Sequence, residues 1–166
     1  MWLALQSGLL AGAVVASYAS SPLANHAYMT HPLWLGAPAA LIRALVGLQL
    51  LAAVAYVAWI CVVELDGSRQ AVPARVYLFN GLFLVSQAVW PHAARLLLSH
   101  ASTATAVLAS LPLWASAVGV GGLLGGSLDD PVQTGLLAVL AVLVILVDGV
   151  GWTARAIAQP SAARAN

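Results

Sequence analysis

Five apolar runs, each long enough to cross a lipid bilayer, constrain the fold of this chain more than any other feature. A membrane-spanning α-helix needs about 20 mainly apolar residues, because the hydrocarbon core of a bilayer is about 30 Å thick. The predicted spans cover residues 2–18, 39–63, 76–98, 103–125 and 132–157. The segments between them are too polar to lie in lipid, so we expect an all-α, polytopic transmembrane helical bundle.

Charged side chains are too few to cover a soluble protein of this size. They make up 7% of the 166 residues, against about 25% in an ordinary soluble domain. Hydrophobic residues account for 62% of the chain, so most of its surface is expected to face lipid. We therefore predict a single transmembrane helical domain over residues 1–158, followed by a polar C-terminal tail at residues 159–166.

The first run allows two interpretations. Its length and the small residues that follow it are typical of a cleaved signal peptide, but no basic residue precedes Arg43 to form a positive n-region. We therefore expect a retained span. Gly8, Gly12 and Ala16 are spaced four residues apart, which predicts a close contact with another helix on that face.

The distribution of arginine predicts the orientation. With five spans, one side of the membrane holds the first link and the C-terminus. The basic residues near that side are Arg43, Arg95, Arg155 and Arg164. The opposite side has only Arg69 and Arg75. Because basic residues concentrate on the cytoplasmic side, we expect an integral membrane protein with a cytoplasmic C-terminus.

Several polar side chains lie inside the predicted spans. His92 stands 16 residues after the start of the third span and Asp148 stands 16 residues after the start of the fifth, so both are expected at similar depth. The candidate intramembrane polar site comprises Asp148, His92, Arg95, Arg43, Gln87 and Asn80. A charged group at the centre of a spanning helix costs about 2.5–3.5 kcal/mol on insertion scales, so Asp148 should pair with a base or face a cavity.

Each of these residues also has a structural interpretation. Arginines near helix ends commonly anchor a span at the headgroups. Asn80 and Gln87 are seven residues apart, share one helical face and are predicted to make hydrogen bonds to other helices. Asp148 is the strongest functional candidate, because acids inside spans often mark functional sites. The alternative is that Asp148 forms a structural salt bridge with an arginine.

Tryptophans occur in nearly every predicted span. Trp34, Trp59 and Trp152 fall near the expected membrane boundaries, where tryptophan anchors a helix. We take Trp90, Trp114 and Trp152 as candidate pocket aromatics. Neither an HExxH motif nor a His–Cys cluster is present, so no metal site is predicted, and the cofactors stay unknown.

The sequence "QAVWP" at residues 87–91 is similar to the Asn-x-x-Trp of the third span in the tryptophan-rich sensory protein and translocator family. Five short spans, a long first link and frequent tryptophan extend this loose resemblance. It implies a five-helix bundle that binds porphyrins and other hydrophobic ligands. The family's Trp- and Pro-rich stretch before the second span is not matched by residues 31–47, "HPLWLGAPAALIRALVG", so the resemblance assigns no site residue.

Three functional hypotheses follow. The first is a non-enzymatic multi-pass membrane protein, either a subunit of a membrane complex or a binder of a hydrophobic small molecule. The second is a small transporter, channel or proton-relay component that uses Asp148 and His92. The third and least supported is a membrane enzyme or a porphyrin-binding protein. The expected partners are the lipid bilayer, other membrane subunits or a small molecule, and no basic run indicates nucleic acid.

Overall fold

Helices make up the regular structure of the described residues. A computed structural model describes residues 2–20, 38–66, 72–99 and 103–152. The elements are α1 (Trp2–Ser20), α2 (Ala39–Asp66), α3 (Ala74–Ser99), α4 (Thr103–Gly125), α5 (Pro131–Val142) and the π-helix η4 (Leu143–Trp152). No strand occurs in these ranges, which confirms the prediction of an all-α fold.

The helices follow the predicted runs closely. Four of them coincide with the expected spans or extend them by up to three residues at an end. The fifth run differs in kind, because its helix changes from α to π geometry at Leu143. The end of that run at residues 153–157 and the predicted tail at residues 159–166 lie outside the described residues.

Length and composition identify three helices that are able to cross a membrane. These segments are Trp2–Ser20, Ala39–Leu65 and Val107–Gly125. Pro131–Leu146 is apolar but shorter, and α3, which carries Asn80 and Gln87, is not among the three. The described structure therefore supports a helical membrane protein. Helix length and hydropathy do not confirm the prediction of five spans.

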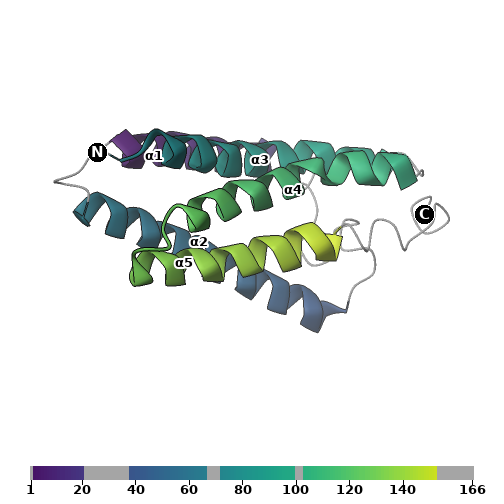
Figure 1. The fold of residues 1–166 in the computed structure, drawn as a ribbon. Coiled ribbons are helices and arrows are strands. Elements are labelled where there is room, and N and C mark those ends of the chain that lie inside the picture. Colours follow the sequence, from purple (N-terminus) through teal and green to yellow (C-terminus); the bar gives the residue numbers. More distant parts are fainter. Residues whose placement is uncertain (1, 21–37, 67–71, 100–102, 153–166) are drawn as a thin grey trace.

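The helices are arranged around a common interior. Helix α3 packs between α1 and α4, α4 contacts α5 and η4, and α5 packs on α2. Figure 1 shows α1 and α3 side by side, α4 between this pair and α5, and α2 next to α5. Helix α1 packs less closely on α2 than on α3, and the backbone N–H of Ala4 on α1 donates a hydrogen bond of 2.9 Å to Oε1 of Glu64 on α2.

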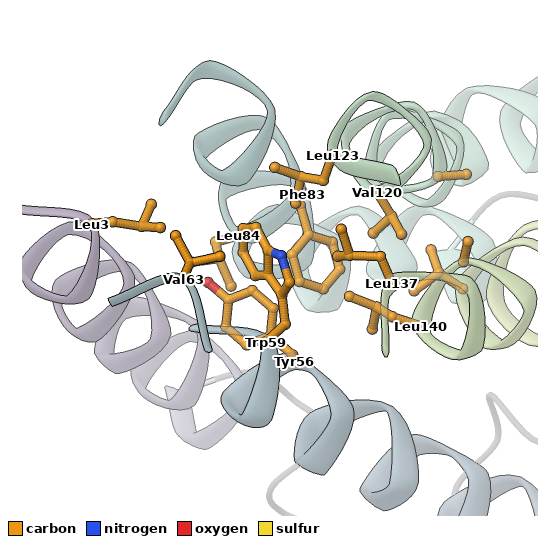
Figure 2. Close-up of a cluster of buried hydrophobic side chains, with 13 residues drawn as sticks. Leu3, Tyr56, Trp59, Val63, Phe83, Leu84, Val120, Leu123, Leu137 and Leu140 are labelled. Carbon is orange, nitrogen blue, oxygen red and sulfur yellow. The ribbon is translucent and has the colours of Figure 1, made fainter. Parts of the chain in front are cut away.

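The interior is filled by apolar and aromatic side chains from all five α-helices (Figure 2). Leu3 comes from the start of α1, Val63 from the end of α2 and Leu123 from the end of α4. Because the helices alternate in direction, these positions lie at one end of the bundle. The core is therefore concentrated in the half that contains the start of α1.

The tightest helix pair is α3 with α4, and glycine makes its close approach possible. A Cβ added to Gly119 would lie 2.7 Å from the backbone nitrogen of Phe83, and one added to Gly122 would lie 2.3 Å from the ring of Phe79. Only a residue without a side chain fits such a contact. By contrast, Gly8 and Gly12 are exposed with open space around them, so the predicted close contact of their face is not made by the described residues.

Candidate functional site

A network of polar side chains lies in the interior of the bundle, centred on Asn80 of α3. Asn80 is fully buried. Its Oδ1 accepts a hydrogen bond of 2.6 Å from the hydroxyl of Tyr56, and its Nδ2 donates to Ser7 Oγ at 3.0 Å and to Gln6 Oε1 at 3.1 Å. One side chain thus joins α1, α2 and α3, as expected where water cannot satisfy polar groups.

Further bonds close this network. The hydroxyl of Ser7 also hydrogen-bonds to that of Tyr56, so Ser7, Tyr56 and Asn80 form a three-membered ring of contacts. Gln6 donates from Nε2 to the carbonyl oxygen of Tyr77 at 3.1 Å. Both amide protons and the amide oxygen of Asn80 are therefore used, which matches the rule that buried polar groups are hydrogen-bonded.

A second set of polar contacts lies further along α3. Gln87 donates from Nε2 to the hydroxyl of Ser116 on α4 at 2.9 Å, and Ser116 is fully buried. The hydroxyl of Ser17 on α1 donates to the carbonyl oxygen of Ala88. The prediction that Asn80 and Gln87 bond to other helices is confirmed, although the two residues bond to different helices.

Trp59 does not have the boundary position that its place in the sequence predicts. Its side chain is 1% exposed and stands in the middle of the core, among Val63, Phe83 and Leu84 (Figure 2). Interpretation as a headgroup anchor is wrong, because this side chain is packed against residues of α3 and is not exposed on the surface of the bundle. Within the described part of the chain, no acceptor lies within hydrogen-bonding distance of its indole Nε1.

Two aromatic rings accompany this unpaired donor. The ring centroids of Tyr56 and Trp59 are 6.0 Å apart, and those of Tyr56 and Phe83 are 5.4 Å apart, both in tilted arrangements. Such separations are within the range of favourable aromatic contacts. Tyr56 therefore belongs to both parts of the site: its hydroxyl is in the polar network and its ring packs beside Trp59.

The charged part of the candidate intramembrane polar site is described only in part. Arg43 and His92 are both exposed on the surface of the bundle. The side chains of Arg95 and Asp148 lie outside the described residues, so the expected approach of Asp148 to His92 or Arg95 stays a prediction. The backbone of Asp148 belongs to η4, and π-helical turns occur frequently at functional sites.

The candidate pocket aromatics lie in different environments. Trp90 is buried, whereas Trp114 is 38% exposed. A Cβ added to Gly149 would lie 3.6 Å from the Trp114 ring, which places α4 against η4 next to Asp148. The side chain of Trp152 lies outside the described residues. In the described ranges, no three His, Cys, Asp or Glu side chains gather where they could hold a metal ion.

Sequence reasoning identified Asn80 but missed its partners. Gln6 and Ser7 lower the hydropathy of the first apolar run. Their polarity was the available signal that α1 forms hydrogen bonds with a polar residue of another helix. Tyr56 and Trp59 are three residues apart, so they lie near one helical face. Nothing in the sequence shows that this face is turned toward the interior.

No protein-family model matches the chain, no curated protein is similar to it, and no solved structure matches it.

Proposed function

We propose that the chain is a multi-pass integral membrane protein that crosses the bilayer five times, with α5 and η4 forming one span. Helix α3 has 26 residues, which is longer than the roughly 20 that a span needs. Its polar residues Asn80 and Gln87 bond to neighbouring helices, which lowers the cost of placing them in lipid. The cytoplasmic face is the one that holds the C-terminus, because the arginine count favours it.

We further propose that the bundle binds a small, mainly apolar molecule in the half that contains Asn80. The observation that carries this proposal is the indole N–H of Trp59, which is buried in the core and has no acceptor among the residues that the structure describes. Leaving a buried donor unsatisfied costs about 1–3 kcal/mol. A chain that keeps such a donor beside aromatic rings gains this free energy back when a ligand accepts the hydrogen bond.

The surroundings of Trp59 suit a ligand that arrives from the membrane. Helices α1 and α2 pack loosely on each other, and Ser7 and Tyr56 of the polar network lie where they meet. A lipid-soluble molecule that separated α1 from α2 would reach the core directly from the bilayer. Helix α1 contributes Gln6 and Ser7 to the network, which favours a retained first span.

Purification in lipid nanodiscs followed by native mass spectrometry tests the proposal. We expect a small molecule to co-purify, or members of a lipophilic compound panel to raise the unfolding temperature. Trp59→Phe should weaken this effect, whereas Trp2→Phe should not, because Trp2 is 67% exposed at the start of α1. The proposal fails if no compound binds, or if the two variants lose binding equally.

A second candidate function is a proton or ion relay through Asp148. The π-helical geometry over Leu143–Trp152 favours it, because the acid lies within this segment. Proton flux into liposomes that contain the protein is the direct test. Asp148→Asn should abolish the flux and leave the unfolding temperature unchanged. Flux that survives this substitution would exclude the relay.

A further inference from the structure

We infer that the ligand of the proposed binding site is an uncharged molecule with a carbonyl oxygen, which accepts a hydrogen bond from Nε1 of Trp59. This inference rests on the proposed function and specifies its ligand. It follows from which hydrogen-bonding atoms in the core are already used, and from the absence of charge among its described side chains.

The polar network leaves few groups for a ligand. Asn80 donates to Gln6 and Ser7 and accepts from Tyr56, so its hydrogen-bonding atoms are occupied. The Tyr56 hydroxyl donates to Asn80 and also contacts Ser7. Among buried side-chain nitrogen and oxygen atoms in the described residues, only Nε1 of Trp59 has no partner.

The nature of this free atom determines what the ligand must supply. An indole nitrogen is a donor and has no acceptor lone pair, so an alcohol or amine that offered only its proton would gain nothing. The ligand must bring an acceptor. A carbonyl oxygen is a strong, compact acceptor, and it adds no proton that would itself need a partner in the core.

The buried surroundings also favour a neutral molecule. The buried polar residues in the described ranges are Asn80 and serines, with no acid or base among them. An isolated carboxylate or ammonium group would lose its hydration there without a countercharge, which is strongly unfavourable. Tyr56 and Phe83 stand beside Trp59 with tilted rings, and such faces and edges suit a ligand with aromatic rings.

Benzophenone and diphenylmethane form a matched pair of probes, because they differ in the carbonyl oxygen and share two aromatic rings. Dissociation constants are measured for the full chain in nanodiscs. We expect benzophenone to bind on the order of tenfold more tightly, as one hydrogen bond to a buried donor provides about that factor. In Trp59→Phe the ratio should fall to about one, because the donor is gone.

Phe83→Leu is the control variant. It loosens the same aromatic group but keeps the Trp59 N–H, so both probes should bind more weakly and their ratio should stay on the order of tenfold. Equal binding of the two probes to the wild type would overturn the carbonyl inference and leave the proposed function standing. Binding of other compounds with no binding of benzophenone would overturn it as well. If no compound in any panel binds, the proposed function itself fails.

Discussion

The hydroxyl of Tyr56 on α2 donates a hydrogen bond of 2.6 Å to Oδ1 of Asn80 on α3, and the ring of the same tyrosine packs on Phe83 of α3. Because lipid provides no hydrophobic force between helices, such bonds and close backbone packing determine which helices associate. This bond therefore helps to fix the position of α2 relative to the tightly packed α1, α3 and α4.

Removing this bond should destabilise the bundle in a non-additive way. Asn80→Leu deprives Tyr56, Ser7 and Gln6 of a partner and is expected to lower the free energy of unfolding by about 1–3 kcal/mol. Tyr56→Phe removes the hydroxyl that bonds to Asn80 and Ser7 and should cost about 0.6 kcal/mol for each bond, the average measured for interhelical hydrogen bonds in membranes, where the largest value is about 1.7 kcal/mol. The double variant should lose less than the sum, because both substitutions break the same contact.

Reversible unfolding in mixed micelles measures these values. Tyr77→Phe is the matched control, because it removes a phenol hydroxyl from α3 while the Tyr77 carbonyl still accepts from Gln6. Strict additivity of Tyr56→Phe and Asn80→Leu would show that the two side chains do not depend on each other, contrary to this prediction.

The contact between α3 and α4 should be intolerant of a single added carbon at Gly119. Gly119→Ala would place a Cβ 2.7 Å from the Phe83 nitrogen and 2.9 Å from the Phe79 oxygen. Both are backbone atoms of α3, so the helices must separate, at an expected cost of about 1–3 kcal/mol. Thermal unfolding in detergent or nanodiscs measures the loss.

Gly121→Ala provides the control on the same helix. Its added Cβ meets nothing within 4 Å, and alanine is the better helix former by about 1 kcal/mol, so its stability should stay unchanged or rise slightly. Equal destabilisation by both substitutions would mean that glycine serves helix bending here rather than close packing.

More of the fold than of the candidate site could be predicted from the sequence. The apolar runs predict the helices and their ends closely, because bilayer thickness and polar links set both. The close contact at Gly119 and the open space at Gly8 could not be distinguished, since both lie in glycine- and alanine-rich stretches. Which small-residue face meets another helix depends on the rotation of each helix, and these nearly uniform apolar helices contain little information about it.

The candidate site, too, could be predicted only in part from the sequence. Asn80 was identifiable because an amide inside a span needs partners, and its depth could be calculated from the helix rise. The position of Trp59 was predicted wrongly, because its distance from the end of α2 resembles that of a headgroup anchor. Its burial follows from the packing of side chains from other helices, among them Phe83 and Leu84 of α3, against one face of α2, which no local pattern encodes.

The carboxylate of Asp130 should make the stability of the bundle depend on pH. Asp130 caps α5, accepting bonds from the backbone N–H groups of Gln133 and Val132 at 3.1 and 2.8 Å and from the Gln133 side chain at 2.9 Å. The backbone bond from Gln133 and the other donors lower the pKa of this carboxyl below its reference value of 3.8. Its contribution to stability is therefore complete above pH 3.8 and is lost as the pH falls through the lower pKa of the folded state.

Unfolding temperatures measured from about pH 6 down to about pH 3 test this linkage. Asp130→Asn keeps a capping side chain but cannot ionise, so its stability should fall less steeply in acid than that of the wild type. Gln133→Ala removes one donor and should give an intermediate slope. Identical slopes for the wild type and Asp130→Asn would show that this carboxylate is not linked to folding.

Five crossings require the link before α5 and the C-terminal tail to lie on opposite sides of the membrane. Cys61, which is exposed on α2, is first replaced by serine to give a background without thiols. In that background Leu128→Cys, at a site that is 67% exposed, should react with an impermeant thiol reagent added to intact cells. Ser161→Cys is expected to react only after permeabilisation, because the arginine distribution favours a cytoplasmic tail. Labelling of both sites from one side would mean that α5 with η4 does not cross the bilayer. Exchange of the two results would keep five spans and reverse the orientation.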